Sequence, residues 1–361
     1  MHKAVRLVFR ILSILVALGI FACALILGGA AYFNAPPVKA PEPAENAMRI
    51  DDSGGLFLEV KSGETAYSVG KRLENAGVIR SRYLWDILFR LGKEYIKAGY
   101  YSLELPASQT EIRAILVSGE QYLARVTIPE GVTLKKAARI LEESSICSEK
   151  DFLAAASSRE ILDHYRIPGP SMEGYLFPDT YLFNLGYPAE RVVAAMADTF
   201  FSRLGEISPE AAAAFESGRP AGIAEANRRI IIASIVEREY RVPDDAALMA
   251  GVFYNRLDIG MGLQSCATVE YIITEIQDRP HPEMLYNRDL EIRNPYNTYV
   301  WAGLPPGPIS APGETALWAA FNPARSNYLY FRLMDPRDGK HYFSGTLDDH
   351  IKAGALYTKG I

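Results

Sequence analysis

Two glutamates that follow an apolar run, Glu237 and Glu239, could supply acid chemistry. The segment Ile230–Tyr240 predicts a helix, with Asn227 as a candidate N-cap and Pro243 as the stop. At about 100° per residue, Glu239 falls within the apolar face of this helix and Glu237 on roughly the opposite side. Burial raises the pKa of a carboxyl group, so Glu239 would stay protonated near neutral pH and could act as a general acid. The alternative is a final turn that reaches solvent, which would leave both glutamates as ordinary surface charges.

A second segment, Met172–Tyr181, combines aromatic side chains with two carboxylates, Glu173 and Asp179. This combination is typical of carbohydrate clefts, where rings stack on sugar faces and carboxylates bind hydroxyl groups. Both carboxylates are therefore candidates for binding a sugar substrate. The alternative is a turn formed around Pro178 and capped by Asp179.

Further polar candidates lie in segments rich in glycine and proline. Gln264 ends a Gly-Met-Gly-Leu-Gln run, and Asn297 and Tyr299 belong to a Pro-Tyr-Asn-Thr-Tyr run. Residues 303–313, Gly-Leu-Pro-Pro-Gly-Pro-Ile-Ser-Ala-Pro-Gly, predict a long ordered loop. Structured loops of this kind usually shape sites.

The N-terminus predicts a membrane anchor. Residues 11–33 form an uncharged run that is long enough to cross a hydrocarbon layer of about 30 Å. Because Lys3, Arg6 and Arg10 precede this run, residues 1–10 should form a cytoplasmic tail and everything after the span should lie outside the cytoplasm. The alternative is a signal peptide cleaved near the small residues 28–31.

Composition limits the possible partners and sites. The net charge is −5 and the pI about 5.7, with no basic run interleaved with aromatic residues, which argues against nucleic acid as a partner. Five scattered histidines and three cysteines show no metal-binding spacing, so we expect no metal and no other cofactor. Two of the cysteines, Cys147 and Cys266, would be exported and could pair, although two thiols make no disulfide framework.

The remaining chain predicts an α+β protein in several parts. Residues 34–52 are rich in proline, alanine and glutamate and suit a linker. Residues 53–170 carry a weak repeat with an offset of 68 residues, in which Gly63-Glu-Thr answers Gly131-Val-Thr. Each copy predicts a strand, a glycine turn and two helices, a shape similar to the glycan-binding LysM fold. Residues 171–361 would then form a mixed α+β catalytic domain.

Several motifs together resemble the endolytic murein transglycosylase family, whose members are called YceG-like, and the resemblance covers nearly the whole chain. They are Glu173-Gly-Tyr-Leu-Phe-Pro-Asp-Thr180, Ala233-Ser-Ile-Val-Glu-Arg-Glu239, Asn255-Arg-Leu257, Gly260-Met-Gly-Leu-Gln264, Tyr296-Asn-Thr-Tyr299 and the 303–313 segment. One departure is that Cys266-Ala267 stands where the family often has Asp-Pro, so no role for an acid can be carried over to that position.

The resemblance implies cleavage of nascent peptidoglycan strands between N-acetylmuramic acid and N-acetylglucosamine, which leaves 1,6-anhydro ends and limits strand length. It implies penicillin-binding synthases as partners and a single-pass protein of the cytoplasmic (inner) membrane whose catalytic domain is periplasmic or otherwise outside the cytoplasm. It also implies that Glu239 is the catalytic acid and leaves Glu237 as a supporting or surface residue. The expected substrate-binding residues are Gln264, Asn297, Tyr299, Glu173 and Asp179.

Two other functions stay open. A muramidase-type hydrolase would need a second carboxylate, for which Asp179 or Glu173 is the candidate. A non-catalytic peptidoglycan-binding anchor that recruits cell-wall synthases would need no acid at all.

Overall fold

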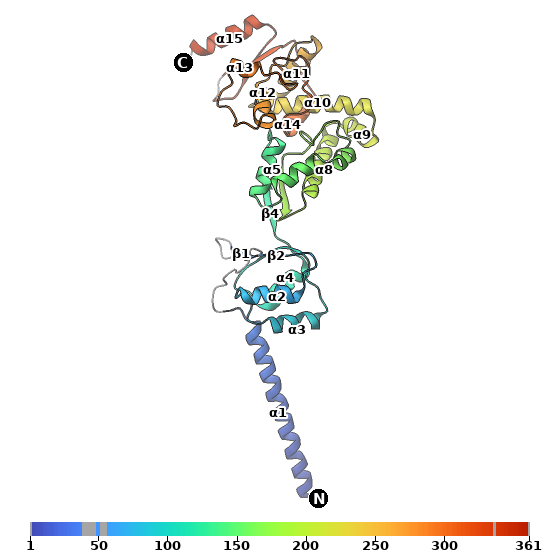
Figure 1. Cartoon of the computed structure of the whole chain (residues 1–361), viewed down its shortest axis with the longest axis vertical. Helices are drawn as coiled ribbons and strands as arrows, with labels where there is room; N and C mark the ends of the chain where they lie inside the picture. The colour runs from blue at the N-terminus through green and yellow to red at the C-terminus, as the bar shows by residue number, and fades with distance from the viewer. Residues whose placement is uncertain (1, 38–47, 51–55, 335–336, 360–361) are drawn as a thin grey trace. The chain divides into compact units, whose positions relative to one another are not determined.

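The structure is a computed structural model that describes residues 2–37, 48–50, 56–334 and 337–359 (Figure 1). Most of the predicted linker, residues 34–52, lies outside the described residues. The chain divides into two compact units, residues 1–123 and residues 124–361, called here the N-terminal and C-terminal units. Helices and small sheets occur together, as in an α+β protein. One apolar helix lies at the N-terminus.

The N-terminal helix α1 spans His2–Asn34. Its portion Leu7–Asn34 is long and apolar enough to cross a membrane by length and composition. The exposed leucine, isoleucine, valine and phenylalanine side chains along this portion are those that a hydrocarbon layer would accept. The helix includes the predicted span of residues 11–33.

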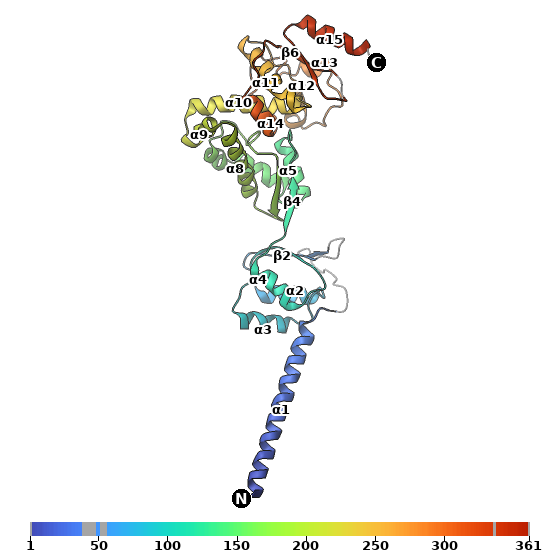
Figure 2. The same ribbon diagram turned by 180° about the vertical axis from the view of Figure 1, so that it is seen from behind.

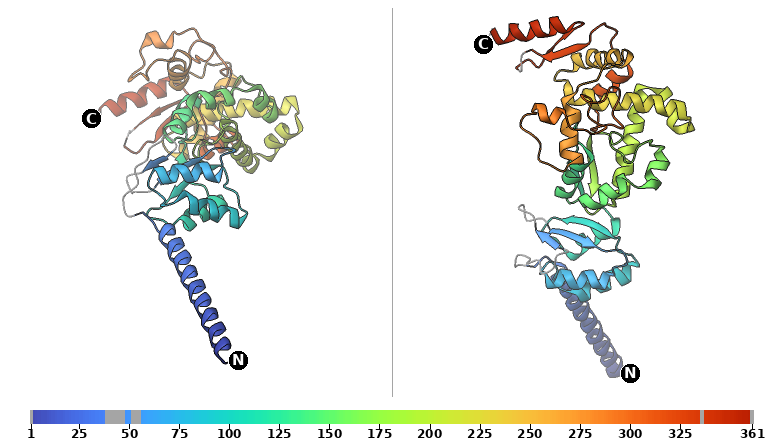
Figure 3. Two further views of the ribbon diagram at one scale, coloured as in Figure 1. Left: turned by 60° about the horizontal axis from the view of Figure 1, so that its bottom comes forward. Right: turned by 45° about the horizontal axis from the view of Figure 1, so that its top comes forward.

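The rest of the N-terminal unit is a three-stranded antiparallel sheet with three helices (Figure 3). Alternate residues of the central strand, Leu56, Leu58 and Val60, are buried and pack in one core with Trp85. The elements are β1 (Met48–Ile50), β2 (Leu56–Val60), α2 (Ala66–Asn75), α3 (Arg82–Gly92), β3 (Gly99–Leu103) and α4 (Gln109–Ser118).

The C-terminal unit is largely helical, with two two-stranded sheets, β4 with β5 and β6 with β7. Its elements are β4 (Leu123–Thr127), α5 (Leu134–Glu143), α6 (Glu149–Ala156), α7 (Arg159–Tyr165), β5 (Thr180–Asn184), α8 (Ala189–Ile207), α9 (Pro209–Ser217), α10 (Pro220–Glu239), α11 (Pro243–Asp258), α12 (Cys266–Tyr271), the π-helix η1 (Ile272–Ile276), α13 (Asn287–Leu290), α14 (Glu314–Phe321), β6 (Tyr330–Leu333), β7 (His341–Ser344) and α15 (Leu347–Lys359). Residues 335–339, Asp-Pro-Arg-Asp-Gly, have a composition that predicts a turn, and of these, residues 335–336 lie outside the described part.

The central element of this unit is α10, which packs against α9, α11 and α14 (Figures 1 and 2). Every residue from Ile230 to Val236 is buried, so this half of the helix has no solvent face. The predicted split into an apolar face and an opposite polar face was therefore wrong for residues 230–236, because neighbouring helices and the 303–313 segment cover this part of α10.

Of the two predictions about the ends of this helix, the stop before Pro243 is confirmed and the N-cap needs correction. The helix begins at Pro220, and Asn227 is not its N-cap but an interior residue whose Oδ1 accepts a hydrogen bond from Tyr175 Oη at 2.6 Å. Pro243 follows the helix and is also the first residue of α11. The backbone N–H at this position has no partner within a helix, so proline, which lacks it, is tolerated there.

The predicted repeat is visible in the element order but not in the division of the chain. Thr65 caps α2 and Thr133 caps α5, and in each copy a strand precedes the capped helix and a second helix follows it. The two copies nevertheless belong to different units, because the second copy shares its hydrophobic core with residues up to Ala320. The expected boundary near residue 170 is therefore replaced by one at Leu123/Ala124.

The segment 303–313 contains no helix and no strand, and most of it is buried. It is attached to α10 by hydrogen bonds at Ser234, whose Oγ accepts from Ile309 N at 3.0 Å and whose carbonyl accepts from Ser310 Oγ at 3.0 Å. These bonds satisfy polar groups that would otherwise be buried without partners. The segment is thereby fixed beside the helix that ends in Glu239.

Candidate active site

Glu239 is the last residue of α10, and its carboxyl group contacts the start of α12. Ser265, the N-cap residue of α12, donates a hydrogen bond from Oγ to Glu239 Oε1. Ser265 is itself held by a hydrogen bond from its backbone N to Thr298 Oγ1 at 3.0 Å. A rigid donor therefore fixes the orientation of the Glu239 carboxyl group.

The pKa of Glu239 is raised, and burial is the main cause. The hydrogen bond from Ser265 opposes this rise, the negative charge of Glu270 adds to it, and the positive charges of His341 and Arg238 oppose it. Glu239 still keeps part of its surface accessible to solvent. A carboxyl group with a raised pKa on a half-buried residue is suited to donate a proton to a bound substrate.

Glu270 lies on α12 between an arginine and a histidine side chain. Its Oε2 is 2.8 Å from Arg238 Nη2 and 3.5 Å from His281 Nε2. The Arg238 pair compensates much of the charge of Glu270. Glu270, the carboxylate whose charge raises the pKa of Glu239, is therefore itself ion-paired.

Tyr299 and Gln264 lie in the segments around the start of α12. The charge of Glu239 acts on Tyr299, whose Oη lies 3.1 Å from Cys266 Sγ, and burial raises the pKa of both of these groups. Gln264 precedes Ser265 in the chain and is exposed, and its backbone has a positive φ of 50°, which is uncommon for a residue other than glycine. Tyr299 is therefore close to the acid, and Gln264 is an exposed polar residue next to the serine that binds it.

Asn297 lies in the same loop but is fully buried. Its Nδ2 donates to Leu290 O at 3.0 Å and to Ile292 O at 2.8 Å, while its Oδ1 accepts from Tyr299 N at 3.0 Å. The amide group is therefore used by the loop itself. Its contribution to the site is to hold Tyr299 in place.

The structure places Glu173 and Asp179 away from the contacts made by Glu239. Glu173 is buried and accepts from Leu134 N at the start of α5, with its two oxygens at 3.3 and 3.2 Å. Burial raises the pKa of Glu173 to about 8. Asp179 is exposed at the start of β5, where Oδ1 accepts from Thr180 N at 2.6 Å. Both carboxylates cap backbone segments, which was the alternative interpretation of this motif.

Glu237 is not the surface charge that the helical projection predicts. It is half-buried, and its Oε2 accepts from Gly313 N at 2.9 Å, at the end of the 303–313 segment. Burial raises its pKa to about 7, and the charge of Glu130 adds to the rise. Two glutamates with raised pKa values therefore flank Arg238, each bound to a different segment.

Sequence reasoning missed Ser265, Glu270, Arg238 and His341. Ser265 was within reach, since it directly follows Gln264 in a motif that was already a candidate. His341 had no sequence signal because it lies on β7, where its Nδ1 is 2.9 Å from Asp245 Oδ2. Among the described residues there is no group of three or more His, Cys, Asp or Glu placed to hold a metal ion.

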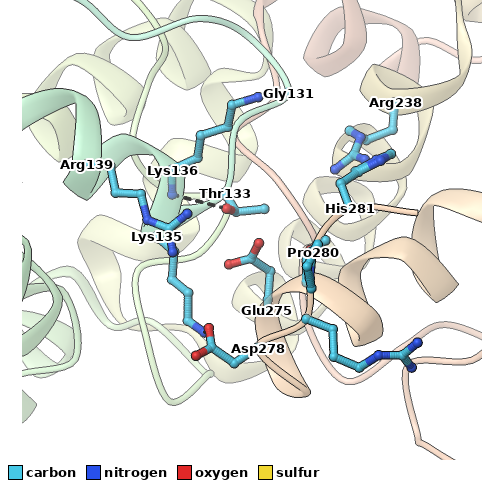
Figure 4. A pocket seen from close by; sticks show the side chains of 12 residues that line it. Gly131, Thr133, Lys135, Lys136, Arg139, Arg238, Glu275, Asp278, Pro280 and His281 are labelled. Carbon is cyan, nitrogen blue, oxygen red and sulfur yellow. Dashed lines mark hydrogen bonds and ion pairs between the residues drawn. The ribbon is translucent and has the colours of Figure 1, made fainter. Parts of the chain in front are cut away.

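A cleft of about 570 Å³ is lined in part by Arg238, the residue that precedes Glu239 in the chain (Figure 4). It lies between the first turns of α5 and the segment that follows η1, and its wall is predominantly basic. The lining residues are Gly131, Thr133, Lys135, Lys136, Arg139, Arg238, Thr274, Glu275, Asp278, Arg279, Pro280 and His281. We call this the basic cleft.

The cysteines are free thiols, so the possible Cys147–Cys266 pair does not form. Cys147 is half-buried and burial raises its pKa to about 11, which leaves it inert near neutral pH.

Comparison with known proteins agrees with the motifs. Residues 58–355 match the model of the YceG-like family. The chain is 29% identical to the endolytic murein transglycosylase of Bacillus subtilis over 92% of this chain and 91% of that protein. It is also 29% identical to the endolytic murein transglycosylase of Streptococcus pneumoniae over 85% of this chain, but it spans only 59% of that longer protein.

A solved structure supports the same grouping. The crystal structure of a YceG-like protein from Listeria monocytogenes matches with a TM-score of 0.54 and 30% identity, covering 83% of this chain and 99% of that one. The chain therefore belongs to the YceG-like family.

Proposed function

We propose that this protein is a membrane-anchored lytic transglycosylase that cleaves peptidoglycan strands internally, between N-acetylmuramic acid and N-acetylglucosamine. The names of the related proteins from Bacillus subtilis and Streptococcus pneumoniae support the reaction class. The observation that carries the proposal is the hydrogen bond from Ser265 to the carboxyl group of Glu239, a half-buried residue whose pKa is raised by burial.

One carboxyl group suffices for this reaction. Neutral Glu239 donates its proton to the glycosidic oxygen as the bond from that oxygen to C1 of the muramic acid breaks. The Glu239 carboxylate then accepts the proton of the C6 hydroxyl group, whose oxygen forms a new bond to C1. The product carries a 1,6-anhydro ring, no water is consumed, and Glu239 ends the cycle protonated.

Neighbouring residues have supporting tasks in this proposal. Ser265 orients the carboxyl group and stabilises its anionic form after proton donation. Gln264 and Tyr299 offer hydrogen bonds to hydroxyl or acetamido groups of the sugars. Arg238 pairs with Glu270 and limits how far that charge raises the pKa of Glu239.

A hydrolase would require a second carboxylate on the other side of the scissile bond. Glu173 is bound to a backbone N–H of α5, Asp179 to the backbone N–H of the next residue, Thr180, and Glu270 is paired with Arg238. These engagements favour the transglycosylase over the hydrolase. A pure binding anchor would have no use for an accessible acid with a raised pKa.

The proposal includes the location of the protein. Helix α1 would anchor it in the cytoplasmic membrane with residues 1–10 in the cytoplasm, which puts the active site outside, close to newly made strands. Cleavage there would limit strand length, and penicillin-binding synthases are the expected partners.

Mass spectrometry of the products made from purified glycan strands tests the reaction. The full chain, Glu239→Gln and Glu237→Gln should be compared. We expect anhydro-terminated fragments from the full chain and from Glu237→Gln, and none from Glu239→Gln. Reducing ends would identify a hydrolase, and the absence of cleavage by the unmodified chain would favour the binding anchor.

A further inference from the structure

The basic cleft contains charges of both signs in separate places. Among the described residues that line it, five are lysine or arginine and two are carboxylates. Lys135, Lys136 and Arg139 come from α5, and Glu275 comes from η1 on the facing wall (Figure 4). The cleft therefore offers an ammonium and guanidinium surface opposite a carboxylate.

Some of these charges are compensated within the protein and some are not. Lys135 Nζ lies 3.0 Å from Asp278 Oδ1, and Arg139 Nε lies 3.6 Å from Glu149 Oε1. In the part of the chain that the structure describes, no ion pair is found for Lys136 or Glu275. These two side chains are available to a ligand of complementary charge.

A pocket of this size accommodates a small molecule or a short peptide. A pyrophosphate group would be attracted by the cations but repelled by Glu275 and Asp278. A ligand with both a carboxylate and an amine satisfies both walls at once. The arrangement favours a zwitterionic peptide over a phosphate.

The cleft is joined to the active site. Arg238 lines the cleft and precedes Glu239 in the chain, and Glu270 contacts both Arg238 and His281. The Arg238–Glu270 pair therefore links the cleft to the acid, so that one substrate could contact both.

We infer that the basic cleft binds the peptide stem carried by the muramic acid of the strand. A stem carboxylate would pair with Lys136 and a stem amine with Glu275. This inference rests on the proposed function, because it names the part of the same substrate that the cleft recognises. It predicts a preference for strands with peptides over strands from which the peptides have been removed.

Cleavage rates on two substrates test the inference. Peptide-bearing strands and strands stripped by an amidase should be given to the full chain, Lys136→Ala, Glu275→Gln and the control Lys150→Ala, which removes an exposed lysine of α6. We expect kcat/KM on peptide-bearing strands to fall about tenfold in the two cleft variants, the loss of one charge-assisted interaction. Rates on stripped strands and the rates of the control should not change.

Equal cleavage of both substrates by the full chain would overturn the inference, as would an equal loss on both substrates in the cleft variants. Calorimetric titration of the full chain with a muramyl tripeptide and with inorganic pyrophosphate gives a measurement that needs no cleavage. Binding of the peptide that is lost in Lys136→Ala supports the inference even if no strand is cut. Tighter binding of pyrophosphate would assign the cleft to a phosphate instead.

A separate observation concerns helix α3 of the N-terminal unit. Its inner face buries Trp85 and Phe89, yet its outer face exposes Tyr83, Ile87 and Leu91 by 68%, 50% and 78%. These three residues are spaced by four and so form one apolar stripe. A soluble surface helix would normally carry polar residues there.

The end of α1 is attached to this part of the N-terminal unit. Arg80, just before α3, donates from Nη2 to Pro36 O at 2.6 Å, and its guanidinium lies 4.6 Å from the centre of the Tyr32 ring. Gln109 donates to Phe33 O at 2.8 Å. Helix α3 therefore lies beside the end of the candidate span (Figure 1).

We propose that the Tyr83–Ile87–Leu91 stripe rests in the lipid headgroup region of the membrane that α1 crosses. Tyrosine and aliphatic side chains on an interfacial helix partition into that region, and Arg82, Arg90 and Lys93 near the stripe suit anionic headgroups. The stripe would hold the N-terminal unit against the membrane surface.

Spin-label accessibility in liposomes tests this proposal with the full chain. A nitroxide would be placed on Ile87→Cys, on Leu18→Cys within α1, and on the exposed Lys61→Cys as a control, each with the native cysteines changed to serine. We expect positions 87 and 18 to collide with oxygen and position 61 with a water-soluble nickel complex. Collisions with oxygen at position 18 and with the nickel complex at position 87 would overturn the proposal but leave the membrane span supported. Collisions with the nickel complex at both positions would contradict the span as well.

Discussion

The hydroxyl group of Ser265 donates a hydrogen bond to Oε1 of Glu239, although the two residues are separated by α11 and a loop. The bond favours the charged form of the carboxyl group and so lowers its pKa, against the larger effect of burial, which raises it. The balance between these two effects sets the pH at which Glu239 can donate a proton.

Removal of the hydrogen bond between Ser265 and Glu239 should shift the pH dependence of kcat/KM. In Ser265→Ala the pKa of Glu239 should rise further, so the alkaline limb of the kcat/KM profile should shift to higher pH. The maximal rate should fall by about tenfold or more, because the carboxyl group loses its orientation. Ser265→Thr keeps the hydroxyl group and should retain the original limb. An unshifted limb in Ser265→Ala would mean that the bond does not affect the titration.

Glu173 should make the fold sensitive to alkaline pH. Its pKa is raised from 4.5 in the unfolded chain to about 8 in the folded protein, because it is buried. The folded state therefore binds more protons between these values, and stability is complete below pH 4.5 and is lost as pH rises towards 8. Glu173→Gln should flatten this dependence.

The measurement for Glu173 is urea unfolding of the full chain at pH 5 and pH 8. We expect the free energy of unfolding of the unmodified chain to fall by at least about 1 kcal/mol more than that of Glu173→Gln. Glu237 contributes in the same direction, with its pKa raised to about 7, so some dependence should remain in the variant. Parallel curves for the two proteins would contradict the prediction.

We expect the side chain of Gln264 to lower the stability of the fold and to increase the rate of cleavage. Its positive φ of 50° costs about 1 kcal/mol in a residue with a side chain, a cost that glycine avoids. Gln264→Gly should therefore unfold at a higher urea concentration and cleave strands more slowly. Chemical denaturation and product formation measured on the same sample check both halves. A variant that is less stable would show that the side chain serves the fold.

Cys266 stands beside Tyr299 and Glu239, at a position where the family resemblance leads one to expect Asp. Cys266→Asp would add a negative charge near Glu239, raise its pKa further and move the alkaline limb upwards. It would also supply a second carboxylate, which could hold a water molecule and divert part of the reaction to hydrolysis. Mass spectrometry should then detect reducing ends beside anhydro ends, whereas Cys266→Ser should give anhydro ends only.

Much of the architecture could be predicted because its signals are local. The apolar run that begins at Ile230, for example, predicts a helix and lies within α10, since hydrophobic periodicity acts within a few positions. The family could be predicted for a different reason, because a set of short motifs in fixed order is more specific than any one of them.

From the sequence alone, the α+β class, the apolar N-terminal helix and the segment that contains the candidate acid could be predicted. Which carboxylates lie together could not be predicted, because it depends on how elements distant in the chain pack. A helical projection describes one helix and not the elements that cover it, so it missed the burial of Glu237 by the 303–313 segment and the caps formed by Glu173 and Asp179. The groups that act on the pKa of Glu239, among them Ser265 and His341 on β7, come close to it only in the folded chain. Contacts between residues so far apart in the chain produce no periodic pattern in the sequence.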